Sequence, residues 1–100
     1  MYTTFNYKTK KAVKEDLALL EALSHGADIE EVGMPKTTPS VEYAINRLKA
    51  RLTCYQPNGD LTDTQCPENG TVYLEGPHYP EPHRWYAQGT VKNRVLVSIK

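Results

Sequence analysis

The sequence lacks an apolar run long enough to cross a membrane, and its first residues, "MYTTFNYKTKK", contain no signal-peptide core. It also lacks net charge, because 12 Lys and Arg balance 12 Asp and Glu. These absences favour a cytoplasmic protein with no membrane partner. They argue against a strongly basic nucleic-acid binder, whose charge usually shows in the total. Any attraction to phosphate must therefore come from a local patch.

Cysteine is scarce, with Cys54 and Cys66 as the two examples. Reduced thiols are expected in a chain without an export signal. A disulfide between the two cysteines is the alternative. Together with His78 and His83 they are suitable zinc ligands, but the eleven-residue gap between the cysteines does not match a zinc knuckle.

Motifs for catalysis are also lacking. Nothing in the sequence marks an activated cysteine, an oxyanion hole, a glycine-rich phosphate loop or a pair of catalytic carboxylates. We therefore expect a protein that is not an enzyme and needs neither a cofactor nor a metal.

The composition that is present, 39% hydrophobic and 24% charged over 100 residues, is typical of one globular domain. Residues 10–52 carry helical periodicity, whereas residues 2–7 and 53–100 are rich in strand and turn signals. The sequence thus predicts an α+β fold, in which a three-helix core packs on a small antiparallel sheet.

The first two predicted helices lie before residue 34. Apolar residues recur on one helical face from about Lys10, and Gly26 suits the left-handed position after the last turn. The following "ADIEEVG" predicts a short second helix, with Asp28 as its cap and Glu31 completing a capping box.

The third predicted helix spans 39–52, with Thr38 as its N-cap and Pro39 in the first helical position. The apolar stripe that it would bury consists of Val41, Ala44, Ile45, Leu48 and Leu52.

The C-terminal half predicts strands. In "TVYLE", Val72 and Leu74 share one face of a strand. The last residues predict a hairpin closed at Lys92–Asn93, with Val95, Val97 and Ile99 on one face.

The order of the helices resembles a known DNA-binding unit. The stretch "EDLALLEALSHGADIEEVG…PSVEYAINRLKARL" resembles the helix-turn-helix output domain of LuxR/FixJ-type transcription regulators. The matching features are Glu15, Leu19, Leu20, Gly26, Glu31, Val32, Ser40, Val41, Ile45, Leu48, Arg51 and Leu52. The turn before the third helix is shorter here and contains Pro35. Because that family carries no β-wing, a winged-helix arrangement is an equal alternative.

The resemblance implies a small DNA-binding regulator whose third helix lies in the major groove of double-stranded DNA. The residues placed to contact DNA would be Lys36, Thr38, Ser40, Tyr43, Asn46, Arg47 and Lys49. A homodimer is expected, because one short helix reads too little of the groove for useful specificity.

A second unusual stretch, "EGPHYPEPHRWYA", together with "KTKKAVKE" resembles small uncharacterised proteins encoded by phages and prophages. Tyr, Trp and Arg dominate interface hot spots, and prolines pre-order a loop for binding. The alternative function is therefore a non-enzymatic phage accessory protein that binds and modulates a host protein through loop 76–86. Its contact residues would be His78, Tyr79, His83, Arg84 and Tyr86.

A structural interpretation of the same loop stands beside the functional one. Trp85 would anchor the core, Tyr86 would lie on the more exposed face, and the two histidines would only form hydrogen bonds within a stiff loop.

Overall fold

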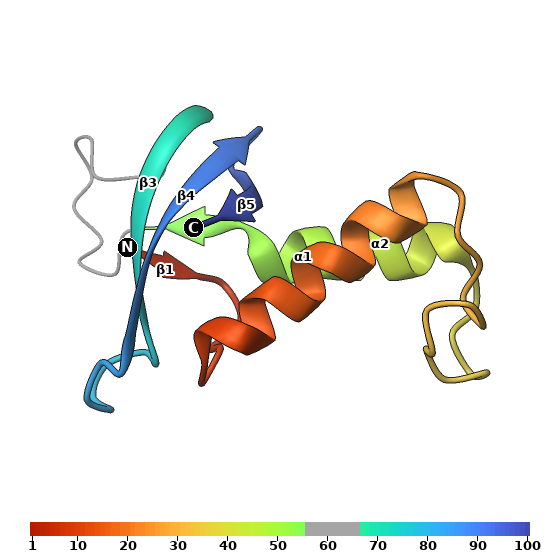
Figure 1. Cartoon of the computed structure of the whole chain (residues 1–100), viewed down its shortest axis with the longest axis horizontal. Coiled ribbons are helices and arrows are strands. Elements are labelled where there is room, and N and C mark those ends of the chain that lie inside the picture. The colour runs from red at the N-terminus through yellow and green to blue at the C-terminus, as the bar shows by residue number, and fades with distance from the viewer. Residues whose placement is uncertain (56–66) are drawn as a thin grey trace.

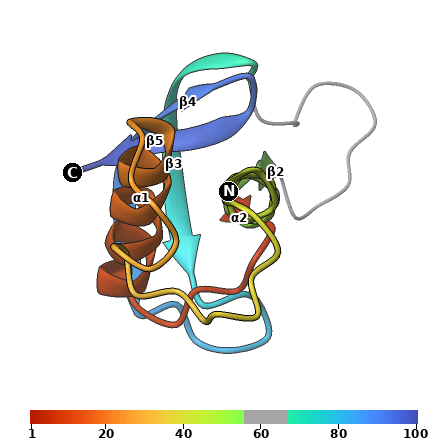
Figure 2. The same ribbon diagram turned by 90° about the vertical axis from the view of Figure 1, so that its right-hand side faces the viewer.

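A computed structural model of the chain describes residues 1–55 and 67–100. Its elements, in chain order, are β1 (Tyr2–Thr3), α1 (Lys10–Ser24), α2 (Val41–Leu52), β2 (Cys54–Tyr55), β3 (Asn69–Gly76), β4 (Trp85–Lys92) and β5 (Val95–Ile99). The two helices run antiparallel beside the sheet β3–β4–β5, and the segment joining them lies at the end away from it (Figures 1 and 2). The α+β class predicted from the sequence is confirmed.

Helix α1 has the bounds that its periodicity predicts. Thr9 caps its N-terminus by accepting a hydrogen bond from the Ala12 amide at 3.1 Å. At the other end the chain reverses through Gly26, whose φ of 101° is readily adopted by glycine. The face of α1 that the core covers carries Val13, Leu20 and Leu23.

The predicted second helix is wrong. Residues 29–33 form only turns, in which the Val32 amide donates to the Asp28 carbonyl at 3.3 Å. The Asp28 carboxylate accepts from the adjacent Ile29 amide instead of closing a capping box. Gly33, at a φ of 78°, ends the segment before it could offset the entropy of helix nucleation. The described residues contain two helices, so the three-helix helix-turn-helix core and its winged variant are both wrong.

Helix α2 begins two residues later than predicted. Ser40, not Thr38, is the N-cap, and its hydroxyl accepts from the Tyr43 amide at 3.0 Å. Pro39 consequently precedes the helix instead of opening it. The predicted apolar stripe is confirmed, with Ala44, Leu48 and Leu52 buried and the other two members packed beside them.

The strands form two sheets, not the single predicted one. In the larger sheet, antiparallel β3 turns Val72 and Leu74 toward the core as predicted. The N-terminal strand pairs instead with β2, where Tyr2 lies opposite Tyr55. The predicted strand 2–7 is short because the chain then follows the end of α2, as the Thr4 amide donates to the Thr53 carbonyl at 2.8 Å.

The C-terminal hairpin exists, but its turn and the faces of its last strand differ from the prediction. The turn is formed by Asn93 and Arg94, with φ of 52° and 67°. A bulge shifts the register between β4 and β5, so Leu96 is fully buried while Val97 is 43% exposed. Strict alternation predicts that Val95, Val97 and Ile99 share one face, and this is wrong because the bulge breaks the two-residue period. Val95 lies opposite Lys92, whereas Ile99 lies opposite Gly89 on the other face of β4.

The helices and the larger sheet enclose one core. Trp85 anchors it as predicted, with its Nε1 donating to the Tyr7 carbonyl at 2.9 Å. This bond ties β4 to the segment before α1. Neither helix in the described part of the chain is long and apolar enough to traverse a membrane.

Candidate functional site

The loop between β3 and β4 is held against the N-terminal strand. His78 makes three contacts there: its amide donates to Asn6 Oδ1 at 2.8 Å, its Nε2 lies 2.9 Å from the Thr3 carbonyl oxygen, and its ring stacks on Tyr2. At the end of the loop, the Arg84 amide donates to the Gly76 carbonyl at 2.6 Å. The loop is therefore a fixed part of the surface.

Tyr2 is the centre of this attachment. Its hydroxyl accepts from the Tyr79 amide at 3.0 Å and lies 2.9 Å from Nε2 of His83. The other ring nitrogen of His83 lies 3.4 Å from a carboxylate oxygen of Glu75. The histidines form hydrogen bonds, as the structural interpretation predicts, but their partners lie in the N-terminal strand and not within the loop.

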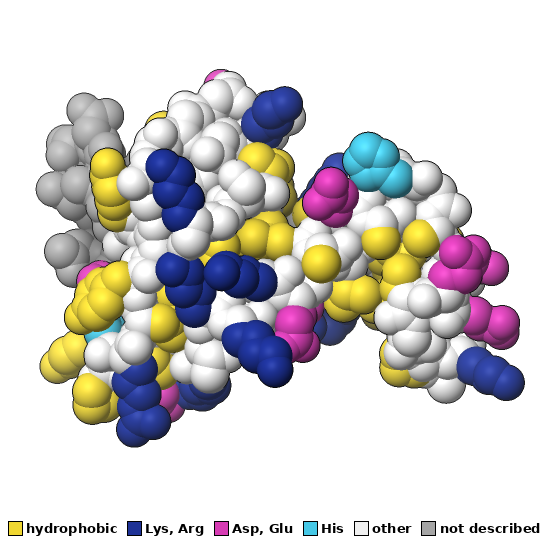
Figure 3. Space-filling model, in the orientation of Figure 1, with side chains coloured by type: hydrophobic (Ala, Val, Ile, Leu, Met, Phe, Trp, Pro, Cys, Tyr) yellow, Lys and Arg dark blue, Asp and Glu magenta, His cyan; other side chains and the backbone are white. Residues whose placement is uncertain are grey.

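The tyrosines around this attachment point outward. Tyr73, Tyr79 and Tyr86 are 70%, 81% and 64% exposed, and we call these three residues the tyrosine surface. Tyr73 and Tyr86 are diagonal neighbours on β3 and β4, and with Lys10 they line a shallow hollow of about 360 Å³. Tyr79 lies in the adjoining loop, where the Tyr2 hydroxyl that holds its amide also contacts His83, and the His83 ring contacts that of Tyr86. Figure 3 shows hydrophobic side chains and a histidine gathered over this end of the sheet.

Positive charge borders the tyrosine surface. Lys10 lines its hollow, and Arg84 is exposed in the adjoining loop. Within the described residues neither side chain takes part in an ion pair, whereas nearby Lys8 pairs with Glu81 at 2.6 Å. Glu75 also lines the hollow, but its carboxylate is engaged by the N-terminal ammonium group and by His83.

The residues predicted to contact DNA lie on or just before α2, apart from the tyrosine surface. Thr38 is half-buried, and the exposed members are Lys36, Ser40, Tyr43, Asn46, Arg47 and Lys49. The Ser40 hydroxyl is already engaged as the N-cap, and the Arg47 guanidinium lies 5.9 Å from the centre of the Tyr43 ring. Because residues 29–33 form turns and not a helix between α1 and α2, the docking geometry of a helix-turn-helix is not available to this face.

The four residues considered for zinc are not assembled by the described part of the chain. Cys54 is buried in β2, and both histidines are bound to the N-terminal strand. Cys66 lies outside the described residues, so a disulfide stays a prediction that the structure does not address. Residues 1–55 and 67–100 contain no group of three His, Cys, Asp or Glu side chains placed to hold a metal.

Two members of this region were missed by sequence reasoning. The alternation in "TVYLE" that buries Val72 and Leu74 also places Tyr73 outward, and this signal could have identified it. The role of Tyr2 had no local signal, because its partners lie more than 75 residues away along the chain.

Comparisons with family models, curated proteins and solved structures find no match to this chain. The function must therefore be argued from the site itself.

Proposed function

We propose that this chain is a non-enzymatic protein-binding module that holds an acidic partner polypeptide on its tyrosine surface. The observation that carries the proposal is the exposure of Tyr73, Tyr79 and Tyr86, two of them on neighbouring strands and one in the loop that joins those strands. Tyrosine offers a large apolar ring and a polar tip at low cost in conformational entropy, and it is enriched among residues that dominate binding energy. An exposed aromatic group of this kind is typical of an interaction site.

The rigidity of the surface supports the same proposal. Tyr2, His78 and His83 fix the loop before any partner arrives, so little backbone entropy is lost on binding. The histidines then act as positioning groups for Tyr79 and Tyr86, and are not themselves the main contacts.

Charge indicates the chemistry of the partner. The unpaired Lys10 and Arg84 beside the tyrosines favour a surface rich in Asp and Glu and disfavour a basic one. The resemblance to phage-encoded proteins suggests a host protein as this partner.

Binding of duplex DNA by α2 is a second candidate. The observation that favours it is the exposure of Asn46, Arg47 and Lys49 along one helix. Asn and Arg are the side chains that pair in bidentate fashion with adenine and guanine.

Paired variants separate the two candidates. The first carries Tyr79→Ser and Tyr86→Ser, and the second carries Asn46→Ala and Arg47→Ala. Wild-type chain and both variants are immobilised, and proteins bound from a host extract are compared. We expect a partner retained by the wild type and by the α2 variant but lost from the tyrosine variant.

The purified partner then gives the quantitative result. Loss of two hot-spot tyrosines should weaken its affinity by about thirtyfold or more. Equal affinity of the tyrosine variant would refute the proposal. Salt-dependent binding of a labelled random duplex that disappears in the α2 variant would establish the DNA candidate instead.

A further inference from the structure

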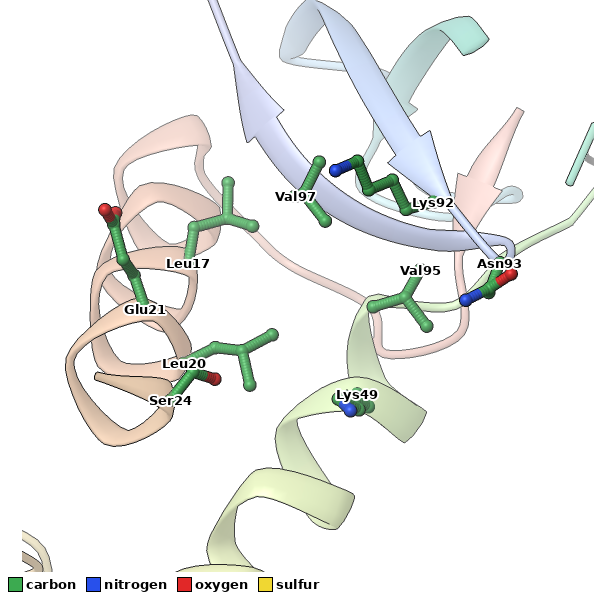
Figure 4. Close-up of a pocket in the computed structure, with 9 residues that line it drawn as sticks. All are labelled: Leu17, Leu20, Glu21, Ser24, Lys49, Lys92, Asn93, Val95 and Val97. Carbon is green, nitrogen blue, oxygen red and sulfur yellow. The ribbon is translucent and has the colours of Figure 1, made fainter. Parts of the chain in front are cut away.

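A second hollow lies between α1, α2 and the β4–β5 hairpin, and it has a volume of about 400 Å³. Leu17 and Leu20 on α1 form one wall and face Val95 and Val97 on β5 (Figure 4). Val97 stays 43% exposed there, although β-branched aliphatic side chains are normally covered. A half-enclosed apolar hollow of this size has the dimensions of a small-molecule site.

Two ammonium groups border the hollow. Lys49 comes from α2 and Lys92 from β4, and within the described residues neither takes part in an ion pair. Glu21 is the acidic side chain at the rim, and in Figure 4 its carboxylate points away from β5. The hollow thus combines an apolar floor with a positively charged rim.

We propose that this hollow binds a small amphipathic carboxylate, a linear aliphatic acid. The alkyl chain would lie between Leu17 and Val97, and the carboxylate would be held by Lys49 and Lys92. The limited volume favours a small ligand over a peptide helix, and the two unpaired ammonium groups select an anion. This site is separate from the tyrosine surface and does not depend on the function proposed for it.

A homologous series of ligands tests the apolar part of the site. Hexanoate, octanoate and decanoate are titrated into the full chain by calorimetry, below the concentrations at which they form micelles. Each added methylene should raise the affinity about fourfold until the hollow is filled. The methyl resonances of Leu17, Val95 and Val97 should shift on binding.

Charge variants test the rim. Replacing Lys49→Gln together with Lys92→Gln should weaken octanoate about tenfold and leave 1-octanol unchanged. The matched control, Arg84→Gln, removes a cation at the tyrosine surface and should leave octanoate binding intact.

Three results would overturn the proposal. The first is the absence of saturable carboxylate binding, and the second is equal binding of octanoate and octyltrimethylammonium. The third is a shift of the Val97 methyl resonances with protein concentration alone, which would show that a second copy of the chain covers the hollow.

Discussion

The Tyr2 hydroxyl lies 2.9 Å from Nε2 of His83, a hydrogen bond between residues that are 81 positions apart. The same oxygen accepts from the Tyr79 amide, and the Tyr2 ring is stacked on His78. One nearly buried side chain of the N-terminal strand thus fixes the shape of the loop that carries Tyr79. The candidate interaction surface depends on a residue that does not belong to it.

Replacing Tyr2→Phe should lower the free energy of unfolding by about 1–3 kcal/mol, because the variant leaves a partly buried amide and a histidine nitrogen without a partner. Urea denaturation measures this change. Hydrogen exchange at the Tyr79 amide should also become faster. The matched control is Tyr55→Phe at an exposed position, and a similar loss in both variants would contradict the assigned role of Tyr2.

Replacing Gly76→Ala should destabilise the chain by about 1–3 kcal/mol, because the added Cβ would lie only 2.5 Å from the Trp85 indole ring. Trp85 is the single tryptophan, so its fluorescence reports the displaced ring directly. In a Trp85→Phe background the smaller ring removes much of the clash, and Gly76→Ala should then cost less. Additive effects of the two substitutions would show that this contact does not limit position 76.

Local patterns in the sequence predicted the elements that depend on local interactions. The bounds of α1 followed from its periodicity and from Gly26, and the inward face of β3 followed from alternation at Val72 and Leu74. The same alternation accounts for the exposure of Tyr73. Contacts such as Tyr2 with His83 join distant segments, and no local pattern encodes them.

Two errors in the sequence prediction have a common cause. In each, a short sequence pattern predicts a regular element, and a neighbouring feature of the chain prevents that element from forming. The capping motif at Asp28 predicted a helix, but Gly33 follows too soon for one to form. The alternation of Val95, Val97 and Ile99 predicted a regular strand, but a bulge reverses the face at Leu96.

The hairpin turn leads to a stability prediction. Arg94 adopts a φ of 67°, a left-handed conformation that costs a side-chain-bearing residue roughly 1–2 kcal/mol. Arg94→Gly would create the Asn-Gly pair preferred in such turns and should raise the thermal midpoint, with a gain of up to about 1 kcal/mol. Lys92→Gly, outside the turn, is the control and should be destabilising. A lower midpoint for Arg94→Gly would mean that its side chain supports the fold in another way.

The N-cap of α2 is tested by a matched pair. Ser40→Ala removes the acceptor of the Tyr43 amide and should cost about 1 kcal/mol, as N-cap substitutions commonly do. Thr38→Ala, at the position that the sequence predicted as the cap, should cost much less. Urea denaturation of the two variants measures both losses in the free energy of unfolding. A larger loss for Thr38→Ala than for Ser40→Ala would show that Thr38 is the N-cap.

Tyr7 should make stability depend on pH in the alkaline range. Its hydroxyl donates to Asp16 Oδ2 at 2.6 Å, and Arg51 Nε lies 3.4 Å from the same oxygen. Burial raises the pKa of Tyr7 well above its usual range, the bond to Asp16 raises it further, and Arg51 opposes part of this shift. The folded chain therefore retains this proton at a pH where the unfolded chain has begun to release it.

The sign of the pH effect follows from this difference. Below the unfolded pKa of about 10 both states hold the proton, and the stabilisation is fully present. As the pH rises above about 10, unfolding releases a proton and the free energy of unfolding falls by up to about 1.4 kcal/mol per pH unit. Tyr7→Phe cannot release this proton, so its stability should decline less steeply than that of the wild type between pH 9 and 11. Tyr55→Phe should follow the wild-type curve, and parallel curves for all three proteins would show that Tyr7 titrates alike in both states.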